Sequence, residues 1–413
     1  MIFLKENKFL RSISNSNTLL AIYITITVIA SVQLLSLGIK TIEGHEYTHY
    51  NNYLIFKQTF HHLINGQNLY CIITERYKNA DYQFWDFKYS PTFAVYMLPF
   101  AYLPVSVGLV LWNLLNTLIL FFAIKVLPRI SDKIKVSILW FILLENITSV
   151  QNTQSNALIA GLIILAFNFL ERKNIIIATL LIALSAYIKP FGVIAFSLFL
   201  FYPGKIKFIL YSIFWMFILF ALPLLFTSFG QLKYLYQSWF QVLKTDYNSW
   251  NGLSVMGWLY SWFNLSINKY IIIFTGFIIL SLSFLKYKSF NNYNFRILFL
   301  ANILIWIVIF NHKAESSTFI IAVAGVALWY FYKKRKFYDL ILICLAFVFT
   351  ILSPTDIFPK YLREHIVVPY VLKAIPCIII WLKIIFELLT FETANNSSES
   401  ISFIKGNDVK NTQ

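Results

Sequence analysis

The stretch LLAIYITITVIASVQLLSL, residues 19–37, contains no charged side chain and is long enough to cross a lipid bilayer. An α-helix rises about 1.5 Å per residue, so a run of this length covers a hydrocarbon core of about 30 Å. Comparable runs lie at residues 208–226, 297–310 and 367–385. Backbone groups in lipid need partners within the protein, and uninterrupted apolar runs meet this need as helices rather than as barrel strands. We therefore predict an all-α, polytopic integral membrane protein.

The composition agrees with a chain that is solvated mostly by lipid. Of its 413 residues, 59% are hydrophobic and 13% are charged, and the mean hydropathy is +0.68. Soluble domains carry about 25% charged residues. The net charge of +16 fits the excess of Lys and Arg in cytoplasmic loops. Nucleic-acid binding would need a basic soluble domain, and the chain has none, so we expect no nucleic-acid partner. The three cysteines are scattered without disulfide or metal-ligand spacing, so we expect no metal site.

Short basic clusters alternate with the apolar runs and set the expected topology. Placing all of them in the cytoplasm gives about twelve transmembrane helices with both termini inside. Residues 1–390 then form one membrane domain, and residues 391–413 form a polar, disordered cytoplasmic tail. The clusters are Lys5/Lys8/Arg11, Lys125/Arg129/Lys133/Lys135, Arg172/Lys173, Lys205/Lys207, Lys286/Lys288/Arg296 and Lys333/Lys334/Arg335/Lys336.

Two apolar stretches do not fit a simple crossing. Residues 90–104 are short and contain three prolines, so we expect juxtamembrane helices that do not cross. Residues 178–202 are interrupted by Lys189-Pro190, which predicts two short helices that meet near the outer face. Broken helices at membrane depth usually line a cavity.

The polar residues are concentrated on the predicted outer side, and the largest outer segment is a loop at residues 40–89. This loop is rich in His, Asn, Tyr, Glu and Asp, which neither a simple pore nor an anchor requires. The other outer segments are residues 150–155, the turn near Lys189, and residues 228–268, 311–316 and 353–366. Polar chemistry must lie beside the bilayer rather than inside it, so we predict an active site on the outer face.

Residues 51–70, 87–104, 151–167 and 171–196 form four strings that together resemble glycosyltransferase family 87. These polyprenol-phosphate-sugar-dependent transferases of the GT-C class include bacterial α-mannosyltransferases. The likeness covers most of residues 20–330 and weakens toward the C-terminus. The strings are NNYLIFKQTFHHLINGQNLY (51–70), FKYSPTFAVYMLPFAYLP (87–104), QNTQSNALIAGLIILAF (151–167) and ERKNIIIATLLIALSAYIKPFGVIAF (171–196).

The resemblance implies a GT-C-like fold with its N-terminus inside and a large first outer loop that carries an acidic residue. It implies an inverting hexosyltransferase, mannosyltransferase-like, in a bacterial inner membrane. A polyprenyl-phosphate sugar would be the donor, a lipid or glycan the acceptor, and neither metal nor other cofactor would be needed. The family's pattern has an Asp eighteen residues before the position of Tyr70, and this sequence has Asn52 there. A neutral amide cannot act as a general base.

Such a transfer needs a group that takes the acceptor's proton. We rank Glu46, His312 and Glu315 as candidate catalytic residues. Glu46 shares the first outer loop with Asn52. His312 and Glu315 are three residues apart, so a helix there would present both on one face. The alternative for Glu46 is a loop charge in contact with water. The alternative for His312 and Glu315 is a helix cap. Other carboxylates of the first loop are Glu43, Asp81 and Asp86.

The transfer also needs a cation that offsets charge on the departing phosphate. Lys189 is the first candidate because a lysine beside a helix break in an apolar stretch is costly, although snorkelling to the interface would also explain it. Lys313 and Arg363 are further cations. Gln154 and Asn156 could hydrogen-bond sugar hydroxyls or cap a helix. The candidate substrate-binding residues are Asn52, Lys88, Tyr89, Gln154, Asn156 and Lys189.

Two other functions remain open from the sequence. A lipid or sugar transporter, or a flippase, would be expected to repeat its broken helix in the second half of the chain. The break at Lys189-Pro190 has no clear counterpart there. A non-catalytic partner in envelope assembly is favoured by the Asn at position 52.

Overall fold

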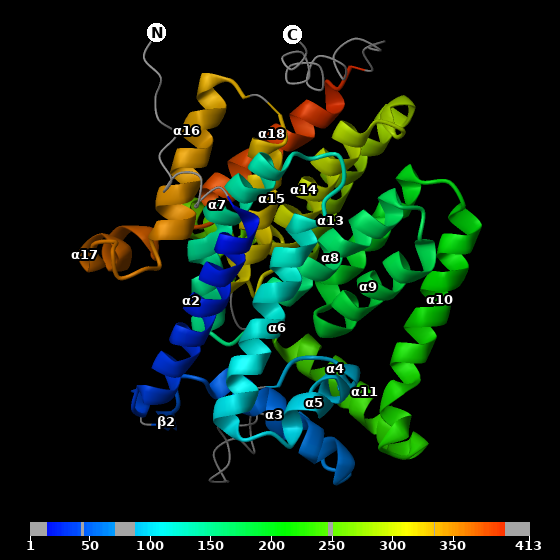
Figure 1. Ribbon diagram of the computed structural model, residues 1–413, viewed down its shortest axis with the longest axis vertical. Coiled ribbons are helices and arrows are strands. Elements are labelled where there is room, and N and C mark those ends of the chain that lie inside the picture. Colours follow the sequence, from blue (N-terminus) through cyan, green and yellow to red (C-terminus); the bar gives the residue numbers. More distant parts are fainter. Residues whose placement is uncertain (1–14, 43–44, 71–86, 247–250, 334, 393–413) are drawn as a thin grey trace, which may run out of the picture.

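The computed structural model describes residues 15–42, 45–70, 87–246, 251–333 and 335–392, and these are mostly helical (Figure 1). The predicted all-α character holds apart from one short antiparallel ribbon, in which Lys40 pairs with Tyr47 and Ile42 with His45. The N-terminal elements are α2 (Ser16–Ser36), β1 (Lys40–Ile42), β2 (His45–Tyr47), α3 (Asn51–Ile64), α4 (Pro91–Tyr96), α5 (Leu98–Ala101), α6 (Val105–Lys125), α7 (Asp132–Gln151), α8 (Asn156–Glu171), α9 (Ile175–Ile188) and η2 (Pro190–Phe201).

The second half continues the helical pattern, with short 3-10 and π segments labelled η. Its elements are α10 (Lys205–Ala221), η3 (Leu222–Leu225), α11 (Phe229–Asp246), α12 (Val255–Phe263), α13 (Lys269–Ser281), η4 (Leu282–Ser289), α14 (Tyr293–Ile309), η5 (Ser316–Thr318), α15 (Phe319–Phe331), α16 (Phe337–Leu345), η6 (Ala346–Leu352), α17 (Lys360–Leu362), η7 (Arg363–Val367) and α18 (Ile375–Leu389).

Within the described residues, five helices are long and apolar enough to cross a membrane: Ser16–Ser36, Val105–Lys125, Asp132–Gln151, Lys205–Leu225 and Lys269–Ser289. At about 1.5 Å per residue, twenty residues cover about 30 Å. Six shorter apolar helices of 10–17 residues accompany them. These findings make the chain a membrane protein, but they do not establish the expected count of about twelve spans.

Both irregular stretches have the form that their prolines predict. Helix α9 ends at Ile188, and η2 begins at Pro190. Lys189 between them is extended, with φ −137° and ψ 129°, because the residue before a proline avoids the helical region. Helices α4 and α5 contain only six and four residues, so neither can cross the bilayer.

The interior of the molecule is built on α14 and α15, which pack against each other and bury nearly all of their residues. Gly325 permits this close approach, because a Cβ atom there would lie 2.7 Å from the carbonyl oxygen of Ala301. Helix α10 lies at the edge of the molecule (Figure 1) and buries only Phe208 and Leu219 of its seventeen residues. Its large exposed apolar surface fits contact with lipid tails.

Two buried ion pairs join arginines of the predicted cytoplasmic clusters to acidic residues on other helices. Arg296 on α14 makes two contacts with Glu171 at the end of α8, Nε to Oε1 at 2.6 Å and Nη2 to Oε2 at 3.0 Å. The Tyr202 hydroxyl donates to the same carboxylate at 2.6 Å. Arg335 Nη1 lies 2.8 Å from Glu387 Oε1 on α18. The bidentate geometry suits arginine and carboxylate, and it fixes helix ends that have no bulk water around them.

The opposite end gathers the segments predicted to lie outside. In Figure 1, β2, α3, α5 and α11 lie at the lower end, whereas α2 begins and α18 ends toward the upper end. Hydrogen bonds join the outer segments across long sequence separations: Asn52 with Asn152, Trp239 with Lys88, Leu253 with Ala314, and Ser261 with Pro369. The tail from residue 393 and the first basic cluster lie outside the described residues.

The predicted topology can be tested by labelling the two ends of the molecule separately. In a background with Cys71→Ser and Cys344→Ser, the exposed Asn65 would be replaced by Cys at the α3 end of the molecule, and the exposed Lys133 at the other. A membrane-impermeant thiol reagent should label Asn65→Cys in intact spheroplasts and Lys133→Cys only after lysis. The reverse pattern would overturn the predicted orientation.

Candidate functional site

The turn between α7 and α8 is the centre of the predicted outer face. Two of its backbone carbonyls are bound by side chains from two other segments, and its Thr153 hydroxyl accepts from a backbone N–H. The Asn52 amide donates to the carbonyl of Asn152 at 2.9 Å, and the indole of Trp112 donates to the carbonyl of Thr153 at 3.0 Å. The backbone N–H of Tyr53 donates to the Thr153 hydroxyl at 3.2 Å. The turn therefore fixes α3 and α6 relative to α7 and α8.

Four of the predicted substrate-binding residues meet beside this turn. The Lys189 ammonium donates to Asn156 Oδ1 at 2.8 Å and lies 5.6 Å from the centre of the Tyr89 ring. The Tyr89 hydroxyl donates to Gln154 Oε1 at 2.7 Å. The other side of the Asn156 amide donates to the carbonyl of Ser317 at 3.0 Å. Neither Gln154 nor Asn156 serves as a simple helix cap, because both side chains join separate segments.

Lys189 is partly buried in the turn between α9 and η2. Removal of its ammonium group from water lowers the pKa of Lys189 to about 8, and the nearby Glu315 carboxylate opposes this shift. The side chain is therefore charged below about pH 8 and loses its charge above it. Burial raises the pKa of Tyr89, so the phenol keeps its proton and remains a donor.

The predicted pair His312 and Glu315 is not on one helical face, which corrects the expectation from its spacing. His312 lies in a turn after α14, and Glu315 precedes η5 as its N-cap. The Glu315 carboxylate accepts from the backbone of Thr318, whose hydroxyl accepts from the Glu315 N–H at 3.2 Å. This is the capping role that its position just before a helix allowed. Glu315 still contributes charge beside Lys189.

Asn52 lines a polar cavity of about 590 Å³ between the first outer loop and the turn. Gln33, Asn51, Gln151 and Asn152 add further amide groups to it. Sequence reasoning missed two ionisable residues of this cavity, His49 and Asp356. His49 is three residues from Asn52 and could have been noticed, but Asp356 comes from a loop three hundred residues away.

A second cavity, of about 540 Å³, adjoins the first and shares Gln151, Asn152 and Asp356 with it. It contains two cationic residues, Arg363 and Lys373, together with apolar residues such as Ile147 and Val367. The Lys373 ammonium is buried and lies 3.0 Å from Glu145 Oε1 on α7. It also donates to the Ser316 hydroxyl at 2.9 Å.

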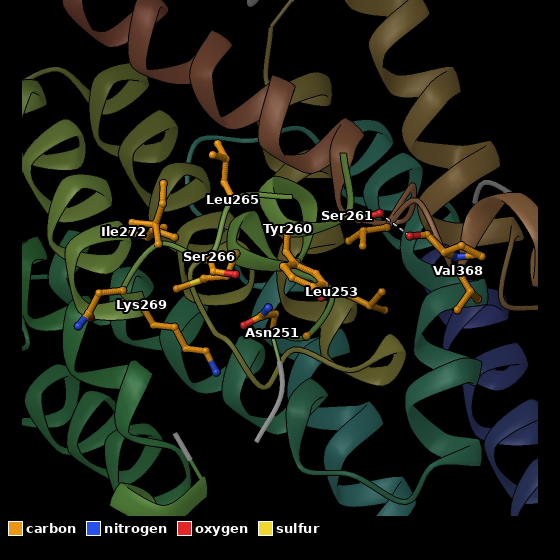
Figure 2. A pocket seen from close by; sticks show the side chains of 16 residues that line it. Asn251, Leu253, Tyr260, Ser261, Leu265, Ser266, Lys269, Ile272 and Val368 are labelled. Atoms are coloured by element: carbon orange, nitrogen blue, oxygen red, sulfur yellow. Dashed lines mark hydrogen bonds between the residues drawn. The ribbon is translucent and has the colours of Figure 1, made fainter. Parts of the chain in front are cut away.

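A third cavity, of about 790 Å³, lies beside the second (Figure 2). Leu253 and Val368 line both of them. Figure 2 shows apolar side chains such as Leu265 and Ile272 around it, with Lys269 at one side and a hydrogen bond from Ser261. Gly252 lets its wall approach the loop after α14, because a Cβ atom there would lie 2.5 Å from the His312 carbonyl oxygen.

The other predicted residues include Lys88 and several acidic residues of the first outer loop. Lys88 contributes its carbonyl oxygen, which accepts from Trp239 Nε1 at 3.0 Å. Glu46 lies on β2, but its side chain is outside the described part of the chain, as are Asp81 and Asp86. Among the described residues, no group of three or more His, Cys, Asp or Glu side chains could hold a metal ion.

Comparison with protein-family models matches residues 87–354 to glycosyltransferase family 87. The chain belongs to glycosyltransferase family 87. The match covers about two thirds of the chain and includes the Lys189 cluster, the Glu145 side of the second cavity and the loop after α14. It confirms the resemblance inferred from the four strings and indicates a glycosyltransferase. No curated protein matches the chain.

The contribution of the buried ion pair of Glu145 and Lys373, beside the second cavity, to the stability of the protein can be tested. Replacing only one partner, as in Lys373→Met, should destabilise the protein by about 3–5 kcal/mol because the other charge stays buried without its partner. The double variant Glu145→Leu/Lys373→Met should lose much less. Thermal unfolding in detergent measures both, and a double variant as unstable as the two single losses combined would contradict the pairing.

Proposed function

We propose that this protein transfers a mannose-like hexose from a polyprenyl-phosphate donor to a lipid or glycan acceptor. The reaction is inverting and needs neither metal nor other cofactor, and the fold that carries it is GT-C-like. The site faces the outer side of a bacterial inner membrane, and both termini are cytoplasmic. The observation that supports this most is the convergence of Lys189 with Tyr89, Gln154 and Asn156 in a chain of this family.

Lys189 is suited to the donor's phosphate. Breaking the bond between sugar and phosphate adds negative charge to the leaving group, and a fixed cation in a site of low water content stabilises it. The Asn156 amide and the Tyr89 ring hold the Lys189 ammonium beside the outer turn. A lysine that only snorkelled would extend its head into water.

Amide and phenol groups next to this cation are suited to a sugar. Gln154 is half-buried, and its N–H₂ group can donate to a hydroxyl while its oxygen accepts from Tyr89; Asn156 is buried and holds Lys189 in place. The third cavity has apolar side chains in its lining that suit a polyprenyl chain, and Leu253 and Val368 connect it to the second cavity. Sugar, phosphate and lipid would thus each meet matching chemistry along one side of the molecule.

The predicted candidates for the general base are Glu46, His312 and Glu315. Glu315 is the one of the three whose charge acts on Lys189. Its carboxylate also caps η5, so its replacement would affect the loop that Asn156 contacts. We therefore consider Glu315 better suited to positioning Lys189 than to accepting a proton.

Lys189→Ala should reduce use of labelled polyprenyl-phosphate-mannose by about 10- to 100-fold, the effect expected for losing one charged hydrogen bond. Lys189→Arg should retain part of the activity, because charge matters more than shape at a monophosphate. The control Lys207→Ala removes an exposed cation at the opposite end and should change little. Unchanged donor kinetics in Lys189→Ala would remove the phosphate role.

The same variants give a test by pH. Donor affinity of the unmodified protein should fall as pH rises through about 8, because Lys189 then loses its charge. Lys189→Arg should show no such fall, since arginine stays protonated throughout this range. Binding of the labelled donor to purified protein between pH 6.5 and 9.5 measures this. Parallel pH profiles for the two proteins would contradict the assignment.

A further inference from the structure

The first and second cavities meet at Asp356, in the loop between η6 and α17. Among the residues that the structure describes, three line both cavities: Gln151 and Asn152 at the end of α7, and Asp356 from the C-terminal part of the chain. Asp356 is the one carboxylate among the described residues that line either cavity. It lies just beyond the segment matched by the family model, which ends at residue 354.

The two cavities differ in chemistry. The first presents the amides of Asn51, Asn52 and Gln151, which suit the hydroxyl groups of a sugar-like acceptor. The second adjoins the proposed phosphate site: Ser316 lines it, and the neighbouring Ser317 carbonyl binds the Asn156 amide that holds Lys189. A carboxylate on their shared boundary stands where an acceptor hydroxyl and a donor sugar would meet.

The Asp356 carboxylate is open to a new partner. Its side chain is fully exposed, and Arg363 Nη1 lies 3.9 Å from its Oδ1, which is longer than a hydrogen bond. Arg363 instead donates from this nitrogen to the carbonyl of Thr355 at 3.2 Å. A bound acceptor could therefore approach Asp356 without first breaking a strong ion pair.

Asn52 cannot supply the proton acceptor of this cavity, and the structure shows what it does instead. Its amide nitrogen donates to the Asn152 carbonyl at 2.9 Å. An Asp at position 52 would bring a carboxylate oxygen against that carbonyl oxygen, which is repulsive. The side chain at position 52 is therefore committed to holding the turn, and the carboxylate of this cavity comes from another segment.

We propose that Asp356 is the general base for the acceptor hydroxyl, an inference that rests on the proposed glycosyl transfer. The Asp356 carboxylate takes the hydroxyl proton while the acceptor oxygen forms its bond to the anomeric carbon. The bond from that carbon to the phosphate oxygen breaks, and its electron pair leaves with polyprenyl phosphate. The proton then passes from Asp356 to water.

Asp356→Asn keeps the size of the side chain and removes the base. With purified protein in vesicles of total bacterial membrane lipid and labelled polyprenyl-phosphate-mannose, the transfer rate should fall about 10²- to 10⁴-fold, the usual contribution of a general base. Donor binding and the melting temperature should stay at the unmodified values. Asp356→Glu should recover part of the rate because it restores a carboxylate.

Two controls remove an exposed carboxylate without touching the cavities. Glu364→Gln lies eight residues away and pairs with Lys360, and Asp132→Asn lies at the opposite end of the molecule. Both should retain the unmodified rate. His49→Ala, Glu46→Gln, His312→Ala and Glu315→Gln test the competing bases.

The outcomes separate this proposal from the one on which it rests. Transfer by the unmodified protein together with a near-normal rate for Asp356→Asn would overturn the base assignment alone. Loss of rate in one of the competing variants, with Asp356→Asn active, would overturn it as well. Absence of transfer by the unmodified protein from this donor would overturn both proposals.

Discussion

The turn from Asn152 to Ser155 is held in place by hydrogen bonds to its backbone carbonyl groups, which lie at the end of a long apolar helix. Thr153 is buried, and a buried carbonyl without a partner costs about 1–3 kcal/mol, so the Thr153 carbonyl needs a partner from the protein. Here the partners are side chains of Asn52 and Trp112, which come from α3 and α6. The hydrogen bonds to this one turn therefore hold α3, in the first outer loop, and α6 in place relative to α7 and α8. The cavities on this face lie around these helices and the turn.

Three buried ion pairs join helices that are distant in the sequence. Glu171 with Arg296 and Glu387 with Arg335 hold one end of the molecule, and Glu145 with Lys373 holds the other. Such pairs are weak evidence for stability, since the cost of desolvation can exceed the attraction. They do fix which helices meet. The pair of Glu145 and Lys373 joins α7 to the start of α18 and so places the C-terminal loops against the turn between α7 and α8.

Asn52 stands at the position where the family's pattern has an acidic residue, and here its side chain has a structural role. The amide is a donor to Asn152, a bond that a carboxylate at the same place could not make. Within the part of the chain that the structure describes, the carboxylate lining the adjoining cavity belongs to Asp356. Asn52 of α3 and Asp356 therefore border one cavity, although they lie far apart in the sequence.

The sequence alone determined that the chain is helical and lies in a membrane, because lipid leaves an apolar segment few ways to satisfy its backbone. It also predicted the break at Lys189, since proline acts locally, and it predicted the grouping of Lys189 with Gln154 and Asn156. It failed for His312 and Glu315, where three-residue spacing suggested a helix and the chain instead forms a turn and a cap. Asp356 and Lys373 could not be found in this way, because their neighbours are hundreds of residues away. Only tertiary packing, in which buried charges and backbone carbonyls must find partners, decided which of the outer segments meet.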